Sequence, residues 1–303
     1  MNSELVEKER IAIERLKAFE SDEPYHLCYS GGKDSDVIRI LAQLAGVKHE
    51  LHHNLTSVDA PETVRYVKSI PDMHIDIPHD KDGNRVSMWS LIVKKGIPPT
   101  RLMRYCCSEL KEKGGEGRLK ITGVRAAESV NRKKNAGVVK IIGKPKTTQK
   151  FAEEIGANYD VNRSGGLVMN MDNSPNRRLV EHCYRTTSTM VNPIIDWTDD
   201  DVWTFLHHYG CSSNPLYQCG KSRIGCIGCP MQNTKIKLRE FEKYPKYKQL
   251  YISAFDKMLK ANTDRVYKYN WQNSIDVFNW WVGIDENQMK LDELLKEGDF
   301  DGA

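Results

Sequence analysis

The sequence has 303 residues, with a hydrophobic content of 39% and a charged content of 28%. A chain of this length can bury a substantial core, and its composition is that of an ordinary soluble protein with one large domain or two smaller ones. No apolar run approaches the roughly 20 residues needed to cross a bilayer, which argues against a membrane-spanning protein. The formal charge, 45 basic minus 41 acidic residues, is +4, and this mild excess does not by itself indicate a nucleic-acid partner.

The first residues and the cysteines indicate the cellular compartment. Residues 1–21 mix Glu, Lys and Arg with isolated apolar residues, which predicts an amphipathic helix and not a signal peptide. We therefore expect a cytoplasmic protein in a reducing compartment, where clustered cysteines are more often metal ligands or catalytic groups than disulfides. The sequence contains eight cysteines: Cys28, Cys106, Cys107, Cys183, Cys211, Cys219, Cys226 and Cys229.

From residue 24 onward, short apolar runs alternate with segments of helical periodicity. Strands are predicted at 24–29, 49–55, 75–77, 118–124 and 191–195. Helices are predicted at 37–44, from 61 onward, at 86–95 and at about 199–209. Strands that alternate with helices predict an α/β fold, with a doubly wound, mostly parallel sheet of five or six strands.

Two later segments depart from this alternation. Residues 129–190 are rich in Lys, Arg, Asn and Gly, which predicts a basic insertion or flexible flap over one end of the sheet. The residues after 233 combine helical spacing with many aromatic side chains, which we expect to pack against the sheet as part of the core, with base stacking by Trp271, Trp280 and Trp281 as the alternative. The sequence thus predicts three parts: an N-terminal helix at 1–23, an α/β domain at 24–232 that includes the insertion and the cysteine cluster, and a helical C-terminal region at 233–303.

The segment between the first predicted strand and the first predicted helix carries the strongest functional signal. It reads Ser30-Gly31-Gly32-Lys33-Asp34-Ser35. Two glycines let the backbone turn sharply and bring N–H groups close to an anion, and the following helix adds its positive N-terminal end. Lys33 adds a mobile positive charge, and Ser30 and Ser35 add hydroxyl donors. The spacing differs from the Walker A pattern. The segment therefore predicts a loop that binds pyrophosphate or sulfate.

Four of the cysteines form two pairs that folding can bring together. Cys106 and Cys107 are adjacent, whereas Cys226 and Cys229 form a C-x-x-C turn in which Gly228 lets the backbone curl around a metal. Soft thiolates suit zinc or an iron–sulfur cluster. Adjacent cysteines fit poorly around one tetrahedral zinc ion but can reach two corners of a larger cluster. The pattern favours an iron–sulfur cluster, with structural zinc, free thiols or a redox pair as the alternatives.

Several motifs, in one order, resemble those of a known family. The loop at 30–35 is similar to that of the PP-loop ATP pyrophosphatases. Within that superfamily the chain resembles the phosphoadenosine phosphosulfate (PAPS) reductase family, including its DndC-like branch in DNA sulfur modification. The resemblance spans about residues 24–232. Beyond the loop it rests on four further motifs, at 123–129, 192–198, 214–217 and 223–226.

The resemblance implies a fold like that of the adenine nucleotide alpha hydrolases and a site for ATP with Mg²⁺, or for a related adenine sulfonucleotide. Residues 30–35 would hold the phosphates. Arg125 and Glu128 follow the fourth predicted strand, at the carboxyl edge where open α/β sheets bind ligands. We expect Lys33, Asp34 and Arg125 to take part in catalysis, with Arg125 offsetting charge on the phosphates.

The resemblance also implies a use for the cysteine pairs. Assimilatory reductases of this family hold a [4Fe–4S] cluster through a Cys-Cys pair and a later C-x-x-C. The matching positions in this sequence are Cys106, Cys107, Cys226 and Cys229. We therefore expect these four residues to be the metal ligands.

Two features differ from the sulfonucleotide reductases. Those enzymes end in a segment with a nucleophilic cysteine, typically within Glu-Cys-Gly-x-His, whereas residues 230–303 contain no cysteine. Reductases also usually have an altered loop, whereas members that cleave ATP between the α- and β-phosphates keep the full Gly-Gly-Lys-Asp-Ser. The leading hypothesis is therefore an ATP pyrophosphatase that adenylates an acceptor for sulfur insertion. The alternatives are a reductase of adenylyl sulfate or phosphoadenylyl sulfate that takes its thiol from elsewhere, and a non-catalytic nucleotide or redox sensor.

The partners follow from this hypothesis. Basic residues of the insertion, among them Arg132, Lys133 and Lys134, suit phosphate contacts and indicate a DNA or tRNA acceptor, with a solvated surface as the alternative. Sulfur transfer implies a cysteine desulfurase or another thiol donor protein. We also expect a homo-oligomer and no association with a membrane.

Overall fold

The computed structural model describes residues 1–112, 114–128, 139–141, 159–161, 167–169, 189–262 and 271–284. The chain divides into two compact units. Unit 1 comprises Met1–His53, Pro61–Asp76 and Gly114–Ile224, and unit 2 comprises Asn54–Ala60, Ile77–Lys113 and Gly225–Ala303. None of the helices in the described part of the chain combines the length and the apolar character needed to span a membrane.

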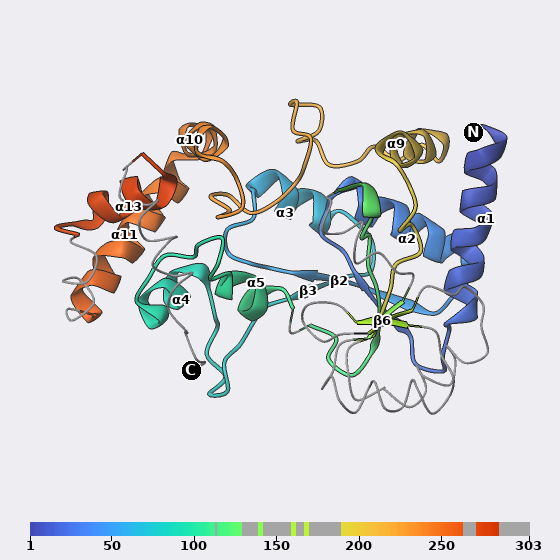
Figure 1. The fold of residues 1–303 in the computed structure, drawn as a ribbon, viewed down its shortest axis with the longest axis horizontal. Coiled ribbons are helices and arrows are strands. Elements are labelled where there is room, and N and C mark those ends of the chain that lie inside the picture. Colours follow the sequence, from blue (N-terminus) through green and yellow to red (C-terminus); the bar gives the residue numbers. More distant parts are fainter. Residues whose placement is uncertain are drawn as a thin grey trace. The chain divides into compact units, whose positions relative to one another are not determined.

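A single sheet organises unit 1 (Figure 1), with the strand order β3-β2-β1-β4-β8-β5-β7-β6. The first five strands run parallel: β3 Met73–Asp76, β2 His49–Asn54, β1 Tyr25–Cys28, β4 Leu119–Ile121 and β8 Thr189–Val191. This confirms the predicted parallel α/β sheet with its flanking helices. Three antiparallel strands extend it: β5 Val139–Ile141, β7 Leu167–Met169 and β6 Tyr159–Val161. They lie in the segment predicted as an insertion or flap, so that segment adds strands to the sheet edge.

The helices of unit 1 begin and end where local sequence favours it. They are α1 Ser3–Ala18, α2 Lys33–Ala45, α3 Pro61–Lys68 and α9 Asp199–His208. The side chain of Asn2 caps α1 by accepting a hydrogen bond from the backbone N–H of Leu5. Gly46 ends α2 with φ of 68°, a left-handed conformation that glycine adopts without steric strain. Both α1 and α9 pack against α2, so these three helices form one layer.

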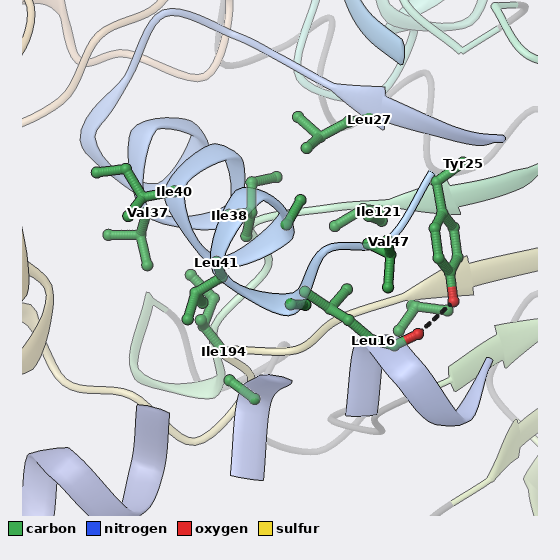
Figure 2. Close-up of a cluster of buried hydrophobic side chains, with 14 of the residues drawn as sticks. Leu16, Tyr25, Leu27, Val37, Ile38, Ile40, Leu41, Val47, Ile121 and Ile194 are labelled. Carbon is green, nitrogen blue, oxygen red and sulfur yellow. Dashed lines mark hydrogen bonds between the residues drawn. The ribbon is translucent and has the colours of Figure 1, made fainter. Parts of the chain in front are cut away.

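The core of unit 1 lies between this helical layer and one face of the sheet (Figure 2). Tyr25 and Leu27 point into it from β1, because alternate residues of a strand share a face. The hydroxyl of Tyr25 donates a hydrogen bond to the backbone oxygen of Leu16 in α1, at 2.8 Å, so its polar atom is satisfied within the core. The odd-numbered residues of β1 therefore fix the helical layer, and His26 and Cys28 face the other side of the sheet.

Replacing Leu41 by alanine should destabilise unit 1 by about 2–5 kcal/mol, because Leu41 is fully buried and its removal leaves a cavity. Chemical denaturation followed by circular dichroism measures the change. Leu44 lies one turn later on α2 and is 43% exposed, so Leu44→Ala should change the free energy of unfolding by about 0.5 kcal/mol or less. Equal effects of the two substitutions would contradict this assignment of the core.

Unit 2 is helical and aromatic. Its helices are α4 Met88–Lys95, α5 Tyr105–Leu110, α10 Thr234–Lys243, α11 Pro245–Ala261 and α13 Ser274–Val282. Helix α11 packs against α4 and α13. Tyr251 and Trp281 are almost fully buried there, with ring centroids 4.5 Å apart. The C-terminal aromatic residues therefore form a core, as predicted, and this core lies among the helices of unit 2 instead of against the sheet strands of unit 1.

The two units differ from the three parts that the sequence predicts. The N-terminal helix belongs to unit 1, because Leu5 and Leu16 are buried in the same core as the sheet. Both cysteine pairs belong to unit 2 together with the C-terminal helices, so the expected boundary at 232/233 falls inside that unit. Compact units are defined by buried contacts, and these join segments that are far apart in sequence.

Candidate active site and cysteine centre

The loop between β1 and α2 is tightly held. Gly31 has φ of +75°, and a Cβ atom there would lie 2.9 Å from Val67 Cγ2 and 3.0 Å from Thr63 Cγ2. The hydroxyl of Ser35 donates to the backbone oxygen of Gly32 at 2.7 Å and accepts from the backbone N–H of Gly32 at 3.0 Å. Conformation and space therefore both require glycine at position 31, and the first turn of α2 is locked onto the loop.

Replacing Gly31 by alanine should destabilise unit 1 by about 2–4 kcal/mol, since the left-handed backbone and the contact with Val67 both oppose a Cβ atom. Gly46 offers a matched control, because its φ is +68° but nothing lies within 4 Å of its would-be Cβ. Gly46→Ala should therefore show only the backbone term, about 1–2 kcal/mol. Thermal or chemical unfolding of both variants checks the difference, and equal losses would contradict the steric part.

The charged loop residues Lys33 and Asp34 form ion pairs with residues of other segments. The Nζ atom of Lys33 lies 2.9 Å from Asp199 Oδ1, and Arg125 Nη2 donates to the same oxygen at 2.6 Å. Arg125 Nε also donates to Asp34 Oδ1 at 2.6 Å. Arg125 is 2% exposed, whereas 67% of the Asp199 side chain is exposed. Two largely buried cations therefore share one exposed carboxylate at the N-terminal end of α2.

These ion pairs change the proton affinity of the groups involved. The hydrogen bond from Lys33, and then that from Arg125, lowers the pKa of Asp199 below its ordinary value. Burial by itself would lower the pKa of Arg125, but the charges and hydrogen bonds of Asp34 and Asp199 outweigh it and raise that pKa. Asp199 is therefore ionised and Arg125 charged at neutral pH.

The strand order explains why Arg125 reaches the loop. The parallel strands β1 and β4 are neighbours, and the loops that follow them leave the same edge of the sheet. The chain leads from β1 outward to β2 and β3, and then returns to β4 on the other side of β1, so a topological switch point lies between β1 and β4. A Cβ atom at Gly123 would lie 3.0 Å from the backbone of Asp34. The chain after β4 thus passes directly against the first turn of α2 and places Arg125 there.

The motif at 214–217 closes around the loop from another side. Asn214 Nδ2 donates to the backbone oxygen of Gly31 at 3.0 Å and to Thr63 Oγ1 at 3.1 Å. The hydroxyl of Tyr217 accepts a hydrogen bond from the backbone N–H of Lys33 at 2.8 Å. These contacts fix the conformation of the loop at the N-terminal end of α2.

Sequence reasoning missed several residues of this site. It gave Asp199 no role beyond the start of a predicted helix, although Asp199 is the first of three acidic residues at the start of α9. It quoted Tyr217 and Asn214 within a family motif without giving them a role. Their contacts join positions more than 180 residues apart, and no local pattern predicts such a pairing.

The remaining candidate residues are Ser30 and Glu128. Ser30 is exposed, with its hydroxyl 3.4 Å from that of Ser35. Glu128 ends the short 3-10 helix Ala126–Glu128, and its side chain lies outside the described residues. The basic residues of the insertion, Arg132, Lys133 and Lys134, also lie outside them.

The two cysteine pairs come from different elements of unit 2. Cys106 and Cys107 lie on α5, a short helix that the sequence analysis did not predict. The turn with Cys226 and Cys229 is anchored by a hydrogen bond from the backbone N–H of Ile227 to the backbone oxygen of Val58, at 2.8 Å. Separate elements thus position the two pairs within one compact unit.

Gly228 shapes the C-x-x-C turn. It has φ of +69°, and a Cβ atom there would lie 2.8 Å from both Phe241 and Trp281. Its backbone N–H donates to Glu240 Oε2 at 3.1 Å. The turn is therefore packed directly on the aromatic core of unit 2, and glycine is required at its centre.

The electrostatics of unit 2 show that the cysteines are neighbours. Burial, and then the charges of Cys226, Cys106 and Cys229, raises the pKa of Tyr251. Cys106 donates a hydrogen bond to Cys107, which raises the pKa of Cys106 and lowers that of Cys107.

Polar neighbours of the turn also suit an anionic sulfur centre. The charge of Cys226 raises the pKa of Lys111, and Thr56 Oγ1 lies 3.6 Å from Cys226 Sγ. Within the described ranges, no three cysteine sulfurs lie close enough together to share one metal ion.

Comparisons with known proteins relate this chain to one family. Residues 24–232 match the phosphoadenosine phosphosulfate reductase domain. An uncharacterised protein of Methanocaldococcus jannaschii is 25% identical over 278 residues, which are 88% of this chain and 54% of that protein. The chain thus spans about half the length of that relative. The adenosine 5′-phosphosulfate reductase of Allochromatium vinosum is 41% identical over 39 residues, or 13% of this chain and 15% of that enzyme.

One solved structure with a similar arrangement is the PAPS reductase of Candida auris. It has a TM-score of 0.42 and 16% identity, covering 76% of this chain and 97% of that one. The FMN adenylyltransferase of Candida glabrata, solved with FAD and pyrophosphate, has a TM-score of 0.40 and 13% identity, covering 75% and 67%. The domain match includes the phosphate loop, Arg125, Asp199 and the motif at 214–217. The chain therefore belongs to the phosphoadenosine phosphosulfate reductase family of the PP-loop superfamily.

Proposed function

We propose that this chain cleaves ATP into pyrophosphate and an adenylated acceptor, as one step of a sulfur-transfer reaction. The observation that carries the proposal is the convergence of Lys33 and Arg125 on one oxygen of Asp199. Both cations lie at the N-terminal end of α2, where the helix dipole also favours an anion. An exposed carboxylate held by two cations can be exchanged for phosphate oxygens, which are stronger partners for them.

The reaction uses these groups as follows. An oxygen of the acceptor attacks the α-phosphorus of ATP and forms a new P–O bond. The bond between the α-phosphorus and the oxygen bridging to the β-phosphate breaks, and pyrophosphate leaves with the electron pair. Lys33 and Arg125 offset the charge that develops on the phosphate oxygens, and residues 30–35 hold the departing pyrophosphate.

Asp34 and Asp199 are the carboxylates that would hold Mg²⁺ together with the phosphates. Magnesium prefers oxygen ligands and usually binds through one or two carboxylates plus substrate phosphates. The metal supplies Lewis-acid stabilisation of phosphate charge when it is bound. Asp34 lies at the first turn of α2, beside Arg125, which supports a role for it in orienting the metal and the phosphates.

Cys106, Cys107, Cys226 and Cys229 would hold a [4Fe–4S] cluster in unit 2. Such a cluster supplies iron sites for redox chemistry or for binding sulfur. Lys111 would offset part of its negative charge. The sulfur would come from a cysteine desulfurase or another thiol donor protein. The basic insertion at 129–190 supports DNA or tRNA as the acceptor, and DNA is what the DndC-like branch modifies.

A reductase acting on adenylyl sulfate or phosphoadenylyl sulfate is the second candidate. The observation that favours it is the 41% identity to an adenosine 5′-phosphosulfate reductase, although this covers 39 residues. A sulfate group offers the loop the same oxygen chemistry as a phosphate. The complete Ser-Gly-Gly-Lys-Asp-Ser loop supports ATP as the substrate instead.

One assay separates the two candidates. The protein is purified without oxygen, iron and sulfide are measured, and ATP and adenylyl sulfate are then supplied in parallel with a thiol donor and nucleic acid. Pyrophosphate released from ATP supports adenylation, whereas sulfite released from adenylyl sulfate without pyrophosphate supports the reductase. ATP binding without turnover of either nucleotide would overturn both and indicate a sensor.

A further inference from the structure

One face of the sheet in unit 1 carries a group of histidines and carboxylates that the proposed reaction does not use. In the parallel register of β1 and β2, His26 is opposite Glu50 and Cys28 is opposite His52. Opposite residues, and alternate residues of a strand, share a face, so both histidines project from the side away from the helical core. Asp76, at the end of the neighbouring strand β3, joins them. Three adjacent strands thus each contribute one side chain with a metal-binding atom.

The three side chains are close enough to share an ion. One ligand atom from each of His26, His52 and Asp76 lies within 4.8 Å of the other two. The two imidazole rings stack with centroids 3.9 Å apart. Within the described part of the chain this is the only such group.

His26 is the most deeply buried member of the group. It is 2% exposed, and neither of its ring nitrogens has a hydrogen-bond partner among the described residues. A Cβ atom at Gly115 would lie 2.5 Å from the His26 ring, so the backbone of Gly115 covers it directly. Burial, and then the charge of His52, lowers the pKa of His26 to about 3. This packing leaves both ring nitrogens of His26 available to an ion.

His52 is oriented as metal-binding histidines usually are. Its Nδ1 lies 2.9 Å from Asp76 Oδ2, and its Nε2 lies 3.4 Å from Glu50 Oε2. Arg118 Nη1 in turn donates to Glu50 Oε2 at 2.7 Å. A carboxylate that accepts from one imidazole nitrogen fixes the ring and leaves the other nitrogen for a metal. The chain from Arg118 through Glu50 to His52 thus directs Nδ1 towards Asp76.

We propose that His26, His52 and Asp76 bind one divalent first-row transition-metal ion, with Zn²⁺ as the best match. Two imidazoles and one carboxylate are a common three-ligand set for zinc, with water at the fourth position. Imidazole nitrogen selects such ions over Mg²⁺ and Ca²⁺, which prefer oxygen ligands. The ligand atoms must move closer together to bind one ion. This site shares no residue with the phosphate loop or the cysteine centre.

The positive charges around the group set a limit on its affinity. Arg118 and Lys120 act on His26 from the β4 side of the sheet, and both lower its pKa. The charge of Arg118 is offset by Glu50.

The test is the binding of zinc itself to the full chain, with its cysteine centre loaded. Zinc is titrated calorimetrically, and the bound ion is examined by X-ray absorption. We expect one zinc per chain beyond any held by cysteine, with ligand distances of about 2.0–2.1 Å typical of nitrogen and oxygen and not the roughly 2.3 Å of sulfur. Sulfur ligation of all bound zinc, or no zinc binding at all, would overturn the proposal.

Variants identify the ligands. Asp76→Asn and His26→Gln should each weaken zinc binding by 100-fold or more, since each removes a direct ligand. Glu50→Gln should weaken it by about 10-fold, because only the orientation of His52 is lost. His208→Gln, at an exposed histidine on α9, should leave it unchanged. Thermal unfolding verifies that each variant is folded, and Asp76→Asn remains informative if His26→Gln is not. Unchanged affinity in folded Asp76→Asn protein would also overturn the proposal.

Discussion

Replacing Lys33 by methionine is expected to lower pyrophosphate release from ATP by about 100-fold or more, the usual effect of removing one charge-stabilising group from a phosphate or oxyanion site. Methionine keeps the length and packing of the side chain, so the change removes mainly the charge. Lys33 is 6% exposed and contacts Asp199, so the loss of charge should be felt at the phosphates rather than in the solvent. Steady-state pyrophosphate release measures the effect, and equilibrium binding of ATP separates binding from turnover.

Lys48→Met provides the matched control for this prediction. Lys48 lies in the same unit, shortly after α2, but its side chain is exposed. The same substitution there should leave pyrophosphate release within a factor of two, since exposed charges contribute little. If Lys33→Met retained full turnover while remaining folded, Lys33 would have no part in the reaction, and the proposed role of the loop would fall with it.

Much of the fold of unit 1 could be predicted because its elements follow simple periodicities. The strand predicted at 49–55 is β2 His49–Asn54, and the helix predicted to begin at Pro61 is α3. The strand predicted at 191–195 instead ends at Val191, and residues 193–196 form a turn. Val191, Ile194 and Ile195 are all buried, so the apolar run reflects burial and not strand conformation. Apolar content alone cannot separate these two states.

The extension of the sheet could not be predicted in the same way. The strands β5, β6 and β7 have three residues each, which is too short to show a clear alternation between apolar and polar residues. Of these three strands only β5 pairs with β8, which is distant in sequence; β7 pairs with β5 and β6 with β7, all antiparallel. The composition of 129–190 therefore concealed strands, because a segment rich in Lys, Asn and Gly is typical of loops.

The residues of the candidate site also differ in how far the sequence alone could predict them. The loop at 30–35 could be recognised because all its parts are consecutive in sequence. Arg125 could be expected near it, since it follows a strand that ends at the same sheet edge. Asp199 could not, because its role depends on where α9 begins relative to Lys33 and Arg125. The same holds for His26, His52 and Asp76, which only the strand order brings together.

Replacing Cys229 by serine is expected to remove most of the iron from the protein. A [4Fe–4S] cluster needs four thiolate ligands, and a serine hydroxyl is a much weaker ligand for iron. Serine is nearly the same size as cysteine, so the turn at Gly228 and the aromatic core beneath it should remain intact. Iron and acid-labile sulfide per chain, measured without oxygen, should fall from about four of each to less than half of that.

The control for this change is Cys219→Ser. Cys219 is exposed and belongs to unit 1, whereas both cysteine pairs belong to unit 2. The Cys219→Ser protein should keep its full iron content. The cluster should also stabilise unit 2, because a group that binds only the folded state raises the free energy of unfolding. Cys229→Ser protein should therefore unfold at a lower temperature than Cys219→Ser protein. Equal iron in the two variants would exclude Cys229 as a ligand. Sulfur-ligated zinc in place of iron, lost in the Cys229→Ser protein, would show that the four cysteines form a structural zinc site.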